Sequence, residues 1–266
     1  KKIRTHCLLF QNQNFLPLQH LSWLNKKILH FYTLKNQYCF LQQQLFPQKI
    51  FHELGYKYLL FRGEKSYNGV ACISKLPFEK FGHKNWVQKK DCRHLFVKIN
   101  NTEIHNFYIP AGGDIPNPVE NEKFFHKMTF LSEMDDWLKK KSNLRSEILL
   151  GDLNIAPLPE DVWSHKQLLN VVSHTPEEVD SLQNVFNSGN YTDIVREFFP
   201  VPEKIFSWWS YRSSNWNISD RGRRLDHIWV TKNLVKKTKD VKIIKETRGW
   251  ERPSDHVPIV INLDLK

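Results

Sequence analysis

The sequence predicts an α/β protein with mixed β-sheets, formed by one domain that spans residues 1–266. Short apolar or β-branched runs of strand length recur along the chain. Some of these runs follow one another directly, whereas amphipathic helical patterns separate others, which favours sheets with both parallel and antiparallel pairs. No repeat, low-complexity tract or Gly/Ser linker divides the 266 residues, and a 40% hydrophobic composition with 9 Trp and 18 Phe provides for a sizeable core.

Six segments are expected to form strands: residues 69–74, 95–99, 104–109, 147–150, 225–230 and 257–263. One helix is predicted within residues 117–141, where apolar residues recur near helical spacing between early acids and a late lysine run. Two further helices are expected, near Pro176 to Asn187 and over about Pro17 to His30.

The charge pattern points weakly to a polyanionic partner. The formal net charge is +11, which is typical of proteins that bind nucleic acid. Residues 1–52 contain seven Lys or Arg and no Asp or Glu, which leaves 32 basic against 28 acidic residues in the rest of the chain. The imbalance therefore comes mainly from missing acids near the start, and not from a basic tail.

Neither a membrane segment nor a disulfide framework is expected. The sequence shows no run of eighteen uncharged apolar residues, and its start lacks the pattern of a secretory signal. The four cysteines, at positions 7, 39, 72 and 92, have no C-x-x-C spacing, so reduced thiols are expected. These features favour a cytoplasmic, monomeric protein that acts away from membranes.

Polar residues suited to catalysis stand at the ends of four predicted strands. They are Tyr108, Asp152 with Asn154, Asp226, and Asp255 with His256. Each alone is compatible with an ordinary turn, and "GDLN" by itself is best explained as one. Because loops at strand ends carry many functional groups, four such ends bearing acid, amide, phenol and imidazole groups favour a common site.

Four ordered motifs carry a resemblance to a known family. "NFYIPAGGD", "LLGDLNIAP", "GRRLDHIWV" and "PSDHVPI" resemble the exonuclease III family of the endonuclease/exonuclease/phosphatase superfamily, over a stretch from about Phe46 to the C-terminus. The resemblance implies a four-layer α/β sandwich, with two mixed β-sheets packed face to face and helices on the outer faces. It also implies a metal-dependent nuclease of base excision repair that acts on abasic sites and 3′ ends of double-stranded DNA.

The resemblance implies a catalytic role for five residues in phosphodiester hydrolysis. Asp152 would orient or deprotonate the attacking water, and Asn154 would hold that water or the phosphate. His256 would bond a phosphate oxygen while Asp226 fixes and charges its imidazole. Tyr108 would donate to the phosphate or to the leaving oxygen. The implied cofactor is Mg²⁺ or Mn²⁺, held by Asp255 with Asp152 and Asn154.

The segment "WWSYRSSNWNISDRGRRLDH" is similar to the family's pocket for a sugar without its base. The residues that the resemblance places against DNA are Trp208, Trp209, Leu225, Arg212, Arg221, Arg223, Arg224 and Asn68. Aromatic walls suit an extruded deoxyribose, and arginines suit flanking phosphates. The alternatives are that Trp209 is a core residue and that some of the arginines belong to an exposed loop face.

The first 45 residues depart from the family pattern. Counting along the chain places the family's metal-site Asn on Cys7 and its metal-binding Glu on Tyr38, and no carboxylate precedes Glu53. Two explanations fit: this stretch is foreign, for example frameshifted, sequence, or the protein has lost a ligand and is impaired. Weak metal binding and reduced nuclease activity are expected. A DNA-binding relative without catalysis and a superfamily phosphatase acting on a phospholipid or inositol phosphate are the competing functions.

Overall fold

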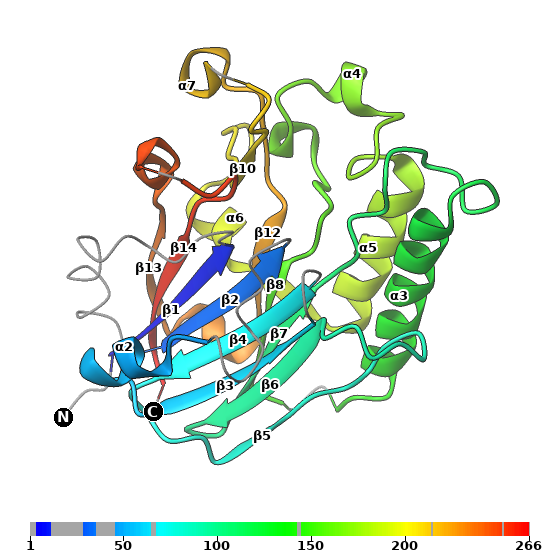
Figure 1. Ribbon diagram of the computed structural model, residues 1–266. Helices are drawn as coiled ribbons and strands as arrows, with labels where there is room; N and C mark the ends of the chain where they lie inside the picture. The colour runs from blue at the N-terminus through cyan, green and yellow to red at the C-terminus, as the bar shows by residue number, and fades with distance from the viewer. Residues whose placement is uncertain are drawn as a thin grey trace.

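Two mixed six-stranded sheets pack against each other in the computed structural model (Figure 1). The structure describes residues 4–11, 29–35, 46–64, 68–142, 145–213, 215–251 and 253–265. Each sheet has one parallel pair at its centre and antiparallel pairs on both sides. The mixed-sheet prediction is therefore confirmed.

The first sheet has the strand order β13-β14-β1-β2-β4-β3, with β1 and β2 as its parallel pair. Its strands are β1 (Arg4–Gln11), β2 (Leu29–Lys35), β3 (Tyr58–Gly63), β4 (Asn68–Ser74), β13 (Thr238–Ile243) and β14 (Ile259–Asp264).

The second sheet has the order β5-β6-β7-β8-β12-β9, with β7 and β8 as its parallel pair. Its strands are β5 (Lys80–Gly82), β6 (His94–Ile99), β7 (Thr102–Tyr108), β8 (Glu147–Asp152), β9 (Tyr191–Asp193) and β12 (Asp226–Thr231). A short hairpin of β10 (Trp208–Trp209) and β11 (Gly222–Arg223) stands apart from both sheets.

Helices complete the described part of the chain. The α-helices are α2 (Gln48–Glu53), α3 (Glu122–Lys139), α4 (His165–Leu168), α5 (Pro176–Ser188), α6 (Ile194–Phe198), α7 (Trp216–Ser219) and α8 (Lys232–Val235), and the 3₁₀ helices are η2 (Pro159–Asp161) and η3 (Lys245–Gly249). The sequence of α5 shows why it begins where it does: Thr175 and Glu178 form a capping box, and Pro176 occupies the first turn.

The main core lies between the two sheets. Cys72 on β4 and Ile261 on β14 belong to the same buried cluster as Ile104 on β7 and Ile228 on β12. A second cluster joins the other face of the second sheet to α3 and α5, which lie side by side in Figure 1. The sandwich with helices outside is thus present over this sheet.

All six predicted strands and two of the three predicted helices are confirmed, with ends that differ by up to two residues from the predicted ones for most strands. The strands that the sequence analysis missed include β5, β9, β10 and β11, which are too short to show a periodic pattern. The helix expected over about Pro17 to His30 lies outside the described residues except at its end, where Leu29 and His30 belong to β2. None of the helices among the described residues is long and apolar enough to cross a bilayer.

Candidate active site

The register of the second sheet brings three of the predicted strand ends together. Asp152, the last residue of β8, lies opposite Tyr108 on β7 and opposite Asp226 on β12. The segment with Asp255 and His256 reaches the same place from the first sheet, just before β14 begins. The polar residues of these strand ends therefore lie together in the structure, and their common function stays a prediction.

The turn after β8 holds Asp152 in a fixed orientation. Gly151 has a φ of +140°, and a Cβ atom at this residue would lie 1.9 Å from the Phe107 carbonyl oxygen, so the close approach of β7 requires glycine. Asn154, with a φ of +53°, donates from its backbone N to Asp152 Oδ1 at 3.0 Å and from Nδ2 to Oδ2 at 2.8 Å. "GDLN" is therefore a turn as well as part of the site.

His256 and Asp226 form a buried pair. The Nδ1 atom of His256 lies 2.7 Å from Asp226 Oδ2, and both side chains are almost fully buried. Burial alone would lower the pKa of His256, but the charge and hydrogen bond of Asp226, with the charges of Asp152 and Asp255, outweigh it and raise the pKa to about 9. The imidazole is therefore positively charged at neutral pH and bonds a negatively charged oxygen well.

Hydrogen bonds from Ser207 and from the β10–β11 hairpin that follows it connect the strand ends of the two sheets. Ser207 accepts hydrogen bonds at its Oγ from the backbone N of Leu225 and of Asp226, and its carbonyl accepts from Val257 N. Trp209 N in turn donates to the Asp255 carbonyl at 2.9 Å. Ser207 thus connects "FSWW" to "LDH" through its hydroxyl and to "DHV" through its backbone carbonyl.

Asp152, Asp226 and His256 offer side-chain atoms that lie within 4.8 Å of one another. Because the His256 ring is protonated at neutral pH, the two carboxylates are the groups that could hold a metal ion. Asp226 Oδ1 is buried and has no hydrogen-bond partner among the described residues, so it is open to a cation or a donor. Oxygen donors of this kind fit Mg²⁺ or Mn²⁺. The predicted ligand Asp255 is not part of this group, and its Oδ2 accepts a hydrogen bond from Trp208 Nε1 at 3.0 Å.

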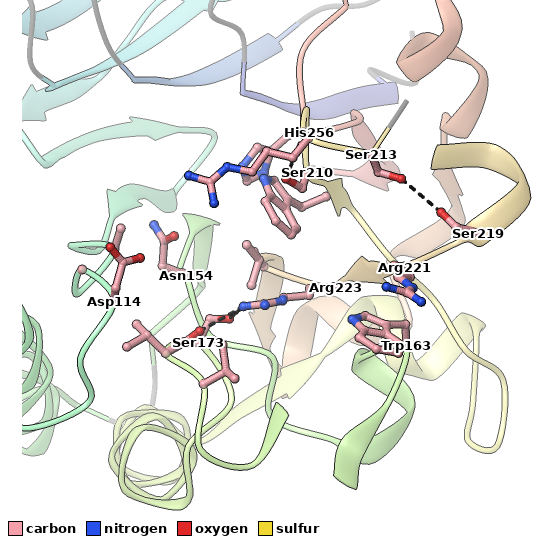
Figure 2. A pocket seen from close by; sticks show the side chains of 17 residues that line it. Asp114, Asn154, Trp163, Ser173, Ser210, Ser213, Ser219, Arg221, Arg223 and His256 are labelled. Atoms are coloured by element: carbon pink, nitrogen blue, oxygen red, sulfur yellow. Dashed lines mark hydrogen bonds between the residues drawn. The ribbon is translucent and has the colours of Figure 1, made fainter. Parts of the chain in front are cut away.

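A pocket of ≈ 780 Å³ opens beside these groups and is shown in Figure 2. His256 and Asn154 border it, together with Trp208 and Leu225. Three of the predicted DNA-contacting arginines also line it: Arg212, Arg221 and Arg223. The guanidinium of Arg223 lies over the Trp208 ring at 5.4 Å, so one wall of the pocket is both aromatic and cationic.

Three of the predicted DNA contacts are placed elsewhere. Arg224 is 1% exposed and is bonded to the carboxylates of Asp161 and Asp193, so it cannot reach a flanking phosphate. Trp209 is 1% exposed and does not line the pocket, which agrees with the alternative of a core residue. Asn68 is 3% exposed and bonds the Asp91 carbonyl, which makes it structural.

Tyr108 lies at the predicted strand end but is only 2% exposed and does not line the pocket. The guanidinium of Arg93 lies over its ring at 5.0 Å. Tyr108 therefore stays a candidate by its position beside Asp152, while its direct contact with a substrate is a prediction.

The sequence analysis missed Trp163 and Ser173, which also line the pocket (Figure 2). Arg221 lies over the Trp163 ring at 4.8 Å, and Ser173 accepts from Arg223 Nη1 at 2.6 Å. Both residues come from the long segment between β8 and α5, where no periodic pattern marks them. Only "GDLN" just upstream points to this segment.

The structure places Cys7 inside a strand and not at its end. Cys7 lies within β1 opposite Ile261, and the strand continues for four residues to Gln11. Because Leu9 pairs with Ile259, the end of β1 approaches the His256 end of β14. Cys7 therefore lies four residues before the end of β1, and its assignment to the family's asparagine position stays a prediction. Tyr38 lies outside the described residues.

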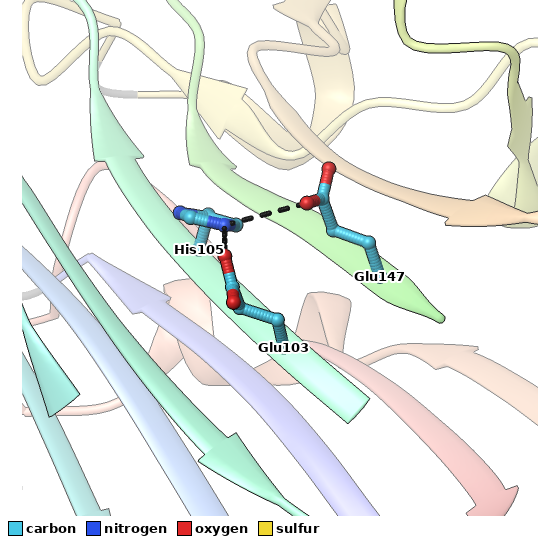
Figure 3. A group of neighbouring side chains, drawn as sticks. All are labelled: Glu103, His105 and Glu147. Atoms are coloured by element: carbon cyan, nitrogen blue, oxygen red, sulfur yellow. Dashed lines mark hydrogen bonds and ion pairs between the residues drawn. The ribbon is translucent and has the colours of Figure 1, made fainter. Parts of the chain in front are cut away.

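A second group of potential ligands occupies the opposite end of β7 and β8 (Figure 3). His105 Nε2 lies 2.7 Å from Glu103 and 3.5 Å from Glu147. The ammonium of Lys141 already contacts all three residues, and Arg145 Nε lies 3.1 Å from Glu147. This group is therefore an ion-pair network whose carboxylates already have cationic partners.

Comparisons with known proteins agree with this geometry. The model of the Endonuclease/Exonuclease/phosphatase family matches residues 10–256, and the chain belongs to this family. It is 30% identical to exodeoxyribonuclease III of Haemophilus influenzae over 229 residues, which cover 81% of this chain and 84% of that protein. It is 24% identical to an exodeoxyribonuclease of Bacillus subtilis over 206 residues, 76% of this chain and 77% of that protein.

The solved structure of an AP endonuclease from Archaeoglobus fulgidus has the same fold. It superposes with a TM-score of 0.87 at 25% identity, covering 98% of this chain and 99% of that one. The family expected from the four motifs and the two-sheet sandwich are both confirmed by these similarities.

Proposed function

We propose that this chain is a DNA phosphodiesterase that cleaves at abasic sites and removes residues from 3′ ends. The observation that carries the proposal is the meeting of Asp152, Asp226 and His256 beside a pocket lined by Trp208 and arginines. Relatives named exodeoxyribonuclease and AP endonuclease support the same substrate class. DNA is thus the proposed partner.

Each group has a task that its geometry suits. The imidazolium of His256, charged by Asp226, stabilises negative charge on the phosphate oxygens as the bond breaks. Asp152 accepts the proton of the attacking water or orients that water, and Asn154 keeps both Asp152 oxygens in place. Arg212 and Arg221 neutralise neighbouring phosphates at the pocket rim.

Asp152 and Asp226 would hold Mg²⁺ or Mn²⁺, whereas the carboxylate of Asp255 accepts a hydrogen bond from Trp208. A bound cation supplies charge neutralisation at phosphorus. No carboxylate precedes Glu53 in the sequence, so the first two strands offer no acidic ligand. Mg²⁺ affinity is therefore expected to be weak, because this ion depends on carboxylates and retained water.

A substrate panel tests the proposal. Purified protein is incubated with an abasic duplex, an undamaged duplex with a recessed 3′ end, and an inositol phosphate. The Mg²⁺ concentrations are about 10 mM and about 0.1 mM, which lie above and at the lower end of the affinity range of weak divalent-cation sites. Cleavage of the two DNAs at the higher concentration is expected. Hydrolysis of the inositol phosphate with intact DNA would refute the substrate class, and robust DNA cleavage at the lower concentration would refute the weak metal site.

A second function is favoured by the missing acidic ligand. The chain then binds abasic DNA through the same pocket without turning it over. Binding measured by fluorescence anisotropy in EDTA, with no cleavage at any Mg²⁺ concentration, would select this alternative. Restoring a glutamate by Tyr38→Glu should then produce cleavage.

A further inference from the structure

A buried ion pair between α3 and α5 contacts the turn that carries Asp152 and Asn154. Lys127 on α3 and Glu178 on α5 are both 0% exposed, and Lys127 Nζ lies 2.5 Å from Glu178 Oε1. Burial lowers the pKa of Lys127, although Glu178 opposes that effect. Such pairs are costly to bury, and well-packed apolar residues often replace them without loss of stability. Stability alone therefore does not explain the pair.

Lys127 reaches the turn that carries the catalytic groups. Its Nζ donates to the carbonyl of Asn154 at 2.8 Å and lies 3.4 Å from the carbonyl of Ala111. Asn154 has a positive φ and holds both carboxylate oxygens of Asp152, so the ammonium fixes the residue that orients the catalytic carboxylate. Gly112 leaves room for this side chain, because a Cβ there would lie 3.0 Å from Lys127 Cδ.

Glu178 reaches the pocket wall on the other side. Its carboxylate accepts from the backbone N of Ser173 at 3.0 and 2.8 Å, and from Thr175 N and Oγ1 at 3.2 and 2.8 Å. The hydroxyl of Ser173, a residue with a φ of +86°, accepts from Arg223 Nη1 at 2.6 Å. Glu178 thus fixes the segment that sets the position of a pocket arginine.

We propose that Lys127 and Glu178 are positioning residues, which hold the Asp152–Asn154 turn at a fixed distance from the Ser173–Arg223 wall of the pocket. This inference rests on the proposed DNA phosphodiesterase function and extends it to two residues that no substrate touches. Lys127 contacts the turn, Glu178 contacts the wall, and the two side chains form one ion pair. The catalytic carboxylate and the substrate pocket are therefore held by a single continuous hydrogen-bonded chain. Small displacements of such a turn reduce turnover by up to about 100-fold.

The test compares Lys127→Met with a matched control, Lys141→Met. Each variant removes a lysine that forms an ion pair with a glutamate. Lys141 pairs with Glu147 at the start of β8, whereas Lys127 pairs with Glu178 and contacts the turn that follows the end of β8. Both should lower the urea midpoint of unfolding. Only Lys127→Met should lower kcat on abasic DNA, by about 10- to 100-fold, while its Kd for that DNA in EDTA stays within about twofold because the pocket wall keeps Glu178.

The double variant Lys127→Met with Glu178→Gln separates positioning from stability. Removing both charges should recover most of the lost urea midpoint, since no uncompensated buried charge remains. The kcat should stay low, because the Asn154 carbonyl still lacks its donor, and the Kd in EDTA should rise as the wall at Ser173 loosens. Recovery of kcat together with stability would overturn the proposal.

A spectroscopic readout keeps the proposal testable without turnover. The side-chain NH₂ resonances of Asn154 in NMR spectra should shift in Lys127→Met and stay unchanged in Lys141→Met. If the wild type cleaves no DNA, the proposed function fails while this readout still decides the positioning role. Unchanged Asn154 resonances in Lys127→Met would overturn that role.

Discussion

The substitution Asp226→Asn should remove the positive charge of the buried His256 ring at neutral pH. Asp226 Oδ2 lies 2.7 Å from His256 Nδ1 inside the protein, and its negative charge opposes the effect of burial on the pKa of His256. The pKa stands at about 9 against an ordinary value of 6.5. That difference corresponds to about 3 kcal/mol of preference for the charged imidazole.

Asparagine keeps the size of the side chain but removes its charge, whereas the burial of His256 remains. The charges of Asp152 and Asp255 still favour the charged ring, so the pKa of His256 should fall from about 9 toward its ordinary value of 6.5. At a pKa of 6.5 the charged fraction at pH 7.5 is about 10%, against about 97% at a pKa of about 9. Turnover should fall in proportion, by up to about tenfold, because the imidazolium stabilises charge on the phosphate.

The assay is an NMR titration of the His256 ring in metal-free protein, with kcat measured at pH 7.5. The buried ring of His227 serves as an internal control, because its pKa, lowered to about 4, depends first on burial and then on Arg224. A raised pKa stabilises the fold below pH 6.5, and this stabilisation is lost as the pH rises through about 9. A His256 pKa that stays near 9 in Asp226→Asn would refute the reasoning.

Three further predictions concern affinity, stability and strand geometry. Arg212→Ala should weaken DNA binding and reduce the slope of log affinity against log salt by about one, as measured by anisotropy at several salt concentrations; an unchanged slope would exclude a phosphate contact. Arg224→Ala should instead destabilise the protein by about 3–5 kcal/mol in urea unfolding, because it leaves Asp161 buried without its main partner; a neutral result would contradict this. Gly151→Ala should destabilise the protein by more than about 4 kcal/mol, because the new Cβ atom would overlap the Phe107 carbonyl. A thermal unfolding midpoint near that of the wild type would contradict the close approach of β7 and β8.

The sequence predicts which polar residues stand at the strand ends, because each motif places such a residue directly beside a buried apolar run. It does not decide between adjacent residues of one type. In "WW" only Trp208 lines the pocket, and in "RR" only Arg223 does, because neighbouring residues of an extended segment face opposite sides. Which side faces the pocket depends on the pairing of β10 with β11, a tertiary feature.

The positions contributed by the first two strands show a different limit. Counting from the chain start assigns the family's asparagine to Cys7, whereas β1 continues to Gln11. A count along the sequence assumes equal strand lengths, so it does not decide which residue of β1 takes that position. Nothing in the sequence marks Lys127 and Glu178 as a buried pair. Lys127 looks like an ordinary surface lysine of a helix, and Glu178 looks like an ordinary capping glutamate.

The rate of cleavage of an abasic duplex as a function of Mg²⁺ concentration tests the central claim most directly. Wild-type protein is compared with Asp152→Asn, which keeps the shape of the side chain that Asn154 holds. The account predicts cleavage that requires Mg²⁺, reaches half its maximum only above about 1 mM because of the missing acidic ligand, and disappears in Asp152→Asn. Cleavage in EDTA, or equal rates in the two proteins, would contradict it.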